Sequence, residues 1–141
     1  ANPTVRFLLY AAVVTGGWSG LLCLAVYGIG RAAGASFLVA SGTGTMPVPW
    51  FGALLVPVFV AVVAALVLSL LRGRSHAGRM TFWAGTVIAV LSMIGPITGG
   101  QGVATIILLA LMHAICWVLI VPQFARIMTD SEPGMSVVRD E

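Results

Sequence analysis

The segment LLALMHAICWVLIVPQFAR, at residues 108–126, decides the structural class of this protein. It belongs to an apolar run over about 103–124, in which His113 is the one histidine. A helix needs about 20 apolar residues to cross the hydrocarbon layer of a bilayer. The segment therefore predicts a membrane-spanning helix with a histidine near the bilayer midplane.

Three more stretches meet the same length requirement, at about 5–29, 50–71 and 80–98. The composition agrees, because 60% of the 141 residues are hydrophobic and 8% are charged, whereas soluble domains carry roughly 25% charged residues. The first span is too long for the apolar core of a signal peptide, which has about 7–15 residues. We expect an all-α membrane protein with a bundle of four transmembrane helices in residues 1–129, followed by an acidic tail at 130–141.

The arginines indicate how the helices are oriented. Arg72, Arg74 and Arg79 lie between the second and third spans, whereas the 31–49 segment carries one arginine and the 99–102 turn none. Basic loops stay on the cytoplasmic side, so we expect both termini in the cytoplasm and the protein in the cell inner (plasma) membrane. The 31–49 segment then faces outward, where a plain connecting loop is preferred over a cap folded across the helix ends.

Small residues recur along the spans at intervals that favour close helix packing, as at Ala12, Gly16 and Gly20. Lipid provides no hydrophobic drive for helix association, so close backbone approach over small side chains takes its place. We interpret these stripes as the seams of the bundle, and contact with a second copy or another subunit is the alternative. Pro57 and Pro96 are expected to kink or end their helices.

His113 is the first candidate for a functional residue, because an ionisable group at membrane depth is costly and faces the bundle interior. Its expected hydrogen-bond partner is a Ser or Thr hydroxyl or a backbone carbonyl, and Ser92, at a similar depth in the third span, is the first choice. The candidate intramembrane polar site further includes three residues of the fourth span, which are Thr105, Met112 and Cys116. A structural hydrogen bond between helices is the preferred role for His113, and a working acid or base is the alternative.

A second candidate surface is an outer mouth that contains Trp50, Thr98 and Gln101, close to the ends of the spans. The Gly-rich 99–102 turn beside it makes this end of the second hairpin short and irregular. A tight turn without a binding role is the simpler interpretation of the same residues.

Neither a metal nor another cofactor is expected. Metal sites need several ligands at one level, whereas Met112 and His113 point about 100° apart on a helix, and His76 lies in the basic loop. Cys23 and Cys116 are expected to differ in depth by about 10 Å or more, which is beyond the reach of a disulfide.

The acids argue against several enzyme and transporter classes, because all four lie at residues 130–141. Proton-coupled multidrug exporters and membrane terpene cyclases rely on membrane-embedded carboxylates, and metal-dependent phosphotransfer on lipids uses Asp or Glu ligands. The spans therefore lack the acidic residues that enzymes of these classes would need. The pI of about 9.5 rests on seven scattered arginines, which fits loop anchors better than a nucleic-acid surface.

Three stretches carry a family resemblance, namely VPWFGALLVPVFVAVVAALVLSLL at 48–71, LSMIGPITGG at 91–100 and LLALMHAICWVLIVPQ at 108–123. Together with the arginine-rich loop, they resemble a family of uncharacterised four-helix membrane proteins of actinobacteria, defined as a domain of unknown function. Gly95-Pro96 and Met112-His113 are its most specific elements, and the likeness covers spans two to four. The resemblance implies the same helix layout and does not imply an activity.

These features together predict a small non-enzymatic membrane protein that forms a homo-oligomer or joins a larger membrane complex. A membrane lipid or another apolar molecule could bind between its helices. One alternative is a minimal channel or transporter, which would have to be oligomeric because a four-helix bundle is too thin for a wide pore. The other is an enzyme on an apolar substrate, with His113 as the acid or base.

Overall fold

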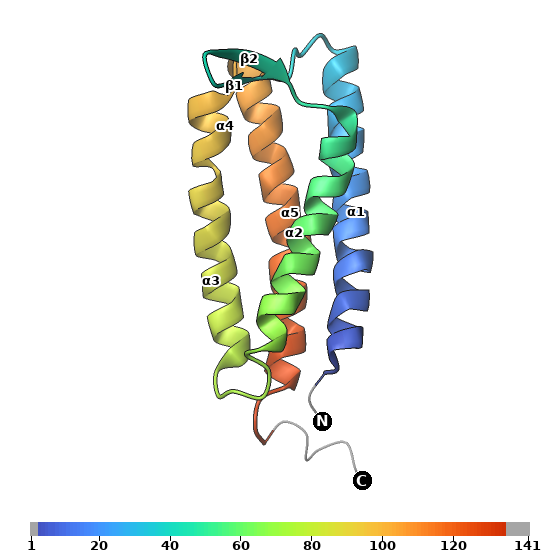
Figure 1. The fold of residues 1–141 in the computed structure, drawn as a ribbon, viewed down its shortest axis with the longest axis vertical. Coiled ribbons are helices and arrows are strands. Elements are labelled where there is room, and N and C mark those ends of the chain that lie inside the picture. Colours follow the sequence, from blue (N-terminus) through green and yellow to red (C-terminus); the bar gives the residue numbers. More distant parts are fainter. Residues whose placement is uncertain (1–2, 135–141) are drawn as a thin grey trace.

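The computed structural model describes residues 3–134 as an up-and-down arrangement of long helices with a small hairpin at one end (Figure 1). The helices are α1 (Val5–Ala32), α2 (Trp50–Ser69), α3 (Ala77–Ser92), α4 (Ile94–Gly99) and α5 (Val103–Asp130), and the strands are β1 (Leu38–Ser41) and β2 (Gly44–Pro47). With α3 and α4 taken together, four helical segments are long and apolar enough to cross a membrane. The predicted four-helix architecture of a multi-pass membrane protein is thus confirmed.

The two ends of the bundle differ in charge and in structure. The start of α1, the turn between α2 and α3, and the end of α5 share one end, which we call the arginine-rich end (Figure 1). It carries Arg6, Arg72, Arg74, Arg79 and Arg126. The β1–β2 hairpin covers the opposite end, which we call the hairpin end.

Local sequence explains where several helices begin and end. The Thr4 side chain caps α1 by accepting the Phe7 N–H at 3.0 Å. The break between α3 and α4 at Met93 precedes Pro96 by less than one turn, as expected, because a proline ring clashes with the carbonyl four residues earlier. By contrast, α2 does not end at Pro57, and α5 continues past 124 to Asp130.

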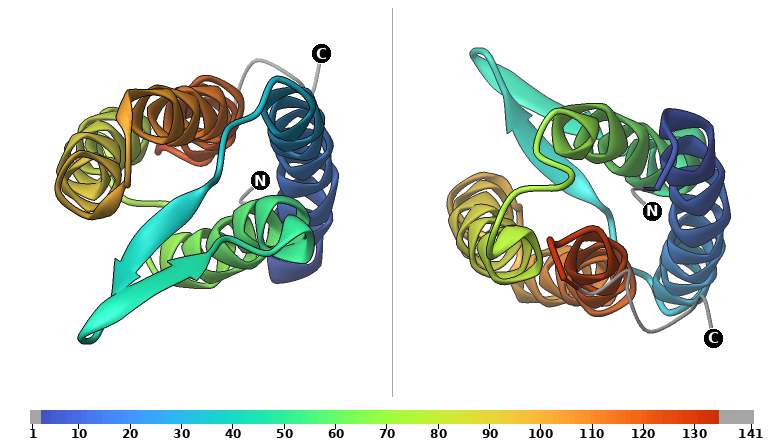
Figure 2. Two further views of the ribbon diagram at one scale, coloured as in Figure 1. Left: turned by 90° about the horizontal axis from the view of Figure 1, so that it is seen from above. Right: turned by 90° about the horizontal axis from the view of Figure 1, so that it is seen from below.

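The bundle consists of two helical hairpins, one formed by α1 and α2 and the other by α3, α4 and α5. The main contact between the hairpins is that of α1 with α5, whereas α2 touches α5 only slightly and shares few contacts with α3. Seen along the bundle, the helices surround a centre in the order α1, α2, α3, α5 (Figure 2). The α1–α5 seam therefore holds the two halves of the molecule together.

Several small residues of the spans, among them Gly16 and Gly85, lie in the seams within each hairpin. A Cβ atom on Gly16 would come within 2.8 Å of the Val58 Cα, so α1 meets α2 at backbone contact there. In the other hairpin, a Cβ on Gly85 would come within 2.9 Å of Val121 of α5. The interpretation of these small residues as seams of the bundle is thereby confirmed.

The 31–49 segment is a folded cap, so the expectation of a plain loop was wrong. Strands β1 and β2 pair antiparallel, and the Gln101 N–H donates to the Leu38 carbonyl at 2.9 Å. Phe37 is fully buried against Tyr27, with ring centroids 4.6 Å apart. Burial of this aromatic residue and the backbone bonds to the α4–α5 turn fix the segment across the helix ends.

Candidate functional site

His113 lies in the middle of α5 and is partly exposed. Its Nδ1 atom is 2.8 Å from the carbonyl oxygen of Leu109, one turn earlier in the same helix. A carbonyl oxygen can only accept, so Nδ1 carries the hydrogen, and in the neutral ring Nε2 is an acceptor. Among residues 3–134 no side-chain nitrogen or oxygen is both buried and unpaired. Nε2, which bonds to none of these residues, therefore keeps accessible surface.

Helical spacing shows which side of α5 His113 occupies. Cys116 belongs to the row of α5 residues that meets α1, and Trp117 and Val121 belong to the row that meets α3. Successive residues turn by about 100°, which puts His113 between the two rows. That side of α5 faces the centre of the bundle (Figure 2), as expected for an intramembrane histidine.

The expected partnership of His113 with Ser92 is wrong. The Ser92 hydroxyl is exposed and donates to the Ala89 carbonyl at 2.6 Å, within its own helix. Thr105 is buried, and its Oγ1 lies 3.4 Å from the Ser36 hydroxyl below the cap. A hydrogen bond does join α5 to α3, but Trp117 makes it, by donating to the Thr86 hydroxyl at 3.0 Å.

Cys23 and Cys116 lie side by side, so the expected separation in depth was also wrong. Their Sγ atoms are 3.8 Å apart, and the Cys23 thiol donates to the Met112 carbonyl at 3.7 Å. The helices are antiparallel, and side chains lean toward the start of their own helix, so the two thiols lean toward each other. Within residues 3–134 no three His, Cys, Asp or Glu side chains are grouped to hold a metal ion.

The residues of the expected outer mouth lie at the hairpin end but do not form a shared site. Thr98 donates to the Ile94 carbonyl at 2.6 Å, and the Gln101 side chain donates to the Gly99 carbonyl at 3.1 Å. Trp50 packs against its neighbour Phe51. Each side chain is therefore engaged locally, and the cap crosses this end of the bundle.

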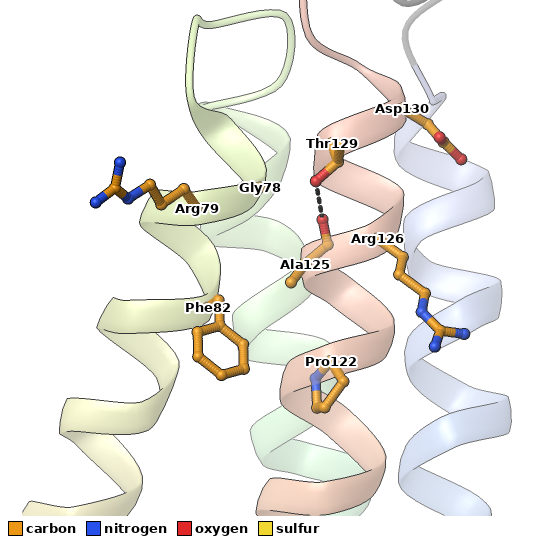
Figure 3. Close-up of a pocket in the computed structure, with 8 residues that line it drawn as sticks. All are labelled: Gly78, Arg79, Phe82, Pro122, Ala125, Arg126, Thr129 and Asp130. Atoms are coloured by element: carbon orange, nitrogen blue, oxygen red, sulfur yellow. Dashed lines mark hydrogen bonds between the residues drawn. The ribbon is translucent and has the colours of Figure 1, made fainter.

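A groove that the sequence analysis missed lies between α3 and α5 at the arginine-rich end (Figure 3). It has a volume of about 640 Å³, and its lining comprises Gly78, Arg79, Phe82, Pro122, Ala125, Arg126, Thr129 and Asp130. The groove is shallow and open along the side of the bundle. The groove thus joins an apolar surface to charged side chains at the end of two spans.

The arrangement of the lining follows from the antiparallel α3–α5 pair. Arg79 is in the first turn of α3 and Arg126 in the last turns of α5, so both exposed arginines lie toward the same end of the bundle. Figure 3 shows the two arginine side chains pointing away from each other, Arg79 outward from α3 and Arg126 from the opposite side of α5, with Phe82 and Pro122 between the helices. The sequence does contain a signal for this groove. One arginine lies at the start of the third span and one follows the fourth, and these two ends are neighbours when the spans pack antiparallel.

Comparison with known proteins gives a family and no activity. A model for a family of unknown function, DUF6069, matches residues 3–130, which extends the likeness seen in spans two to four to the first span. No curated protein and no solved structure matches the chain. The match covers all four spans, the cap and the groove, and the chain therefore belongs to the family of unknown function DUF6069.

Proposed function

We propose that this protein is a non-enzymatic membrane protein that binds an anionic phospholipid in the groove between α3 and α5. The observation that carries the proposal is that two arginines, Arg79 and Arg126, line one groove together with apolar side chains. Guanidinium groups bind phosphate through paired, charge-assisted hydrogen bonds. Phe82 and Pro122 offer an apolar surface to the first part of an acyl chain.

The position of the groove at the ends of the spans supports a lipid as its occupant. Both arginines stand at the ends of spanning helices, where the headgroups of a bilayer lie. Basic pockets between transmembrane helices are a recognised kind of binding site for acidic lipid headgroups. Asp130 at the rim reduces the positive charge, which leaves a net charge of one from these three groups.

The proposal includes the orientation of the protein in the plasma membrane. Arg72, Arg74 and Arg79 lie close together at the arginine-rich end, and the positive-inside rule assigns this end to the cytoplasm. Anionic lipids are attracted there by the remaining arginines as well. The cap then faces the opposite side of the membrane.

The lipid assignment is tested by native mass spectrometry of protein released from bilayers of equal phosphatidylglycerol and phosphatidylcholine. Wild type should retain the anionic lipid preferentially. Each arginine is worth about 1 kcal/mol toward an anionic surface, so R79Q/R126Q should lose about tenfold or more of this preference.

R74Q is the matched control, because Arg74 is exposed near the groove but does not line it. It should retain the preference of wild type for phosphatidylglycerol. An equal loss in R74Q would mean that overall charge attracts the lipid, and an unchanged preference in R79Q/R126Q would rule out the groove.

Assembly with a second copy or another membrane protein is a second candidate function, supported by the surface of α3. In the span at 77–99, 11% of the most apolar 18-residue window is buried, against 39% of the corresponding window in α1. Its large exposed side chains include Trp83, Ile88 and Leu91. The mass of particles extracted in native nanodiscs tests this function, because a strictly monomeric particle would contradict it.

A further inference from the structure

Cys23 and Cys116 bridge the seam between the two helical hairpins. Cys23 is in α1 and Cys116 in α5, and α1–α5 is the main contact between the α1–α2 hairpin and the α3–α5 hairpin. The two residues are 93 positions apart in sequence. A covalent bond here would join the two halves of the bundle at the one seam that holds them together.

The environment of the two thiols favours reaction with each other over reaction with outside groups. Both are free, and their Sγ atoms are 3.8 Å apart, so the sulfurs have to approach by about 1.8 Å to reach the roughly 2.05 Å of a disulfide. Cys23 is 2% exposed and packs in an apolar cluster with Ala53, Leu109 and Met112. Cys116 is partly exposed, so a small lipophilic reagent reaches it first.

We propose that Cys23 and Cys116 are a reversible disulfide site, which a hydroperoxide oxidises to lock the α1–α5 seam. Cys116 loses its proton and attacks the peroxide oxygen as the thiolate, the O–O bond breaks, and the leaving alkoxide takes the proton, which gives a Cys116 sulfenic acid and an alcohol, or water from hydrogen peroxide. The Cys23 thiol then attacks the sulfenic sulfur, and the hydroxyl leaves with the Cys23 proton as water. Two thiols thus lose two electrons and two hydrogens, and the hydroperoxide is reduced.

The disulfide would restrict motion of one helical hairpin relative to the other without any large rearrangement. Apart from α1–α5, contact between the hairpins is slight. With reduced thiols the hairpins are held at this seam by packing and weak sulfur hydrogen bonds. The proposal is independent of the lipid groove, whose lining contains neither cysteine.

The test uses the full chain in proteoliposomes treated with cumene hydroperoxide and then denatured and alkylated with a polyethylene-glycol maleimide. Untreated wild type should take up two labels. Treated wild type should take up none while remaining a monomer on a non-reducing gel, and dithiothreitol should restore both labels. Mass spectrometry should find the Cys23 and Cys116 peptides joined, with the loss of two hydrogens.

Two variants distinguish specific oxidation of the Cys23–Cys116 pair from general oxidation of thiols. C23S should accumulate a Cys116 sulfenic acid that a dimedone probe traps, because the resolving thiol is missing. C116S/V118C keeps two thiols but moves one to an exposed position of α5, and it should form no internal disulfide. Retention of both labels in treated wild type, disulfide-linked dimers, or equal internal oxidation of C116S/V118C would overturn the proposal.

Discussion

Gly16 of α1 lies against Val58 of α2 so closely that a Cβ atom on Gly16 would stand 2.8 Å from the Val58 Cα and 3.1 Å from the Pro57 carbonyl oxygen. Both neighbours are backbone atoms, which cannot move aside as the tip of a side chain could. The seam of the first hairpin therefore depends on the absence of a side chain at this position.

Gly16→Ala should destabilise the protein by about 1–3 kcal/mol, because the added methyl group forces the helices apart. Gly17→Ala is the matched control, since a Cβ there meets nothing within 4 Å. Reversible unfolding in mixed micelles measures both variants. Equal stability of the two would show that α1 and α2 tolerate a wider separation than the structure has.

His113→Leu should change the free energy of unfolding by less than about 1 kcal/mol. The imidazole bonds to Leu109 within its own helix, so no bond between helices is lost, and such bonds in membrane proteins average about 0.6 kcal/mol in any case. The same unfolding assay checks the value. A loss above about 2 kcal/mol would mean that Nε2 has a partner in the folded protein that stabilises the bundle.

Phe37→Ala should release the cap from the helix ends. Phe37 is fully buried, and removing such a side chain from a packed site costs roughly 3–5 kcal/mol. Amide hydrogen exchange should become faster over residues 38–47 and remain unchanged over α2. Met46→Ala is the control, because Met46 is in the same hairpin but is 47% exposed, and protection equal in both variants would contradict the anchoring role of Phe37.

Cysteine labelling in intact cells tests the orientation, in a background with C23S and C116S. A thiol introduced by S75C, in the turn at the arginine-rich end, should be shielded from a membrane-impermeant maleimide until the cells are opened. A thiol introduced by T43C, beside the hairpin turn, should react at once. The reverse pattern would place the arginine-rich end outside.

The four spans could be predicted because lipid makes a severe demand on the chain. Every backbone N–H and C=O in the hydrocarbon layer needs a partner, and a helix supplies these partners within one segment. The apolar length of 103–124 alone therefore predicts a helix, and the structure has one at Val103–Asp130. The break before Pro96 followed in the same way from the geometry of one residue.

The seam at Gly16 was also accessible from sequence, because small residues at intervals of four mark one face of a helix. The identity of the partner was not. A stripe of small residues fits a neighbouring helix of the same chain as well as one of a second copy. Only the contact with Val58 showed that α2 occupies this face.

The sequence by itself determined the number of spans, their order and the position of His113 within its span, since each follows from a single segment and its length. Only the tertiary structure decided that Cys23 meets Cys116, that Ser92 is not the partner of His113, and that Arg79 and Arg126 line one groove. These relationships depend on the tilt and relative height of helices far apart in the chain. Apolar side chains can pack at many such heights with similar energy in lipid, so no local pattern of residues specifies one of them.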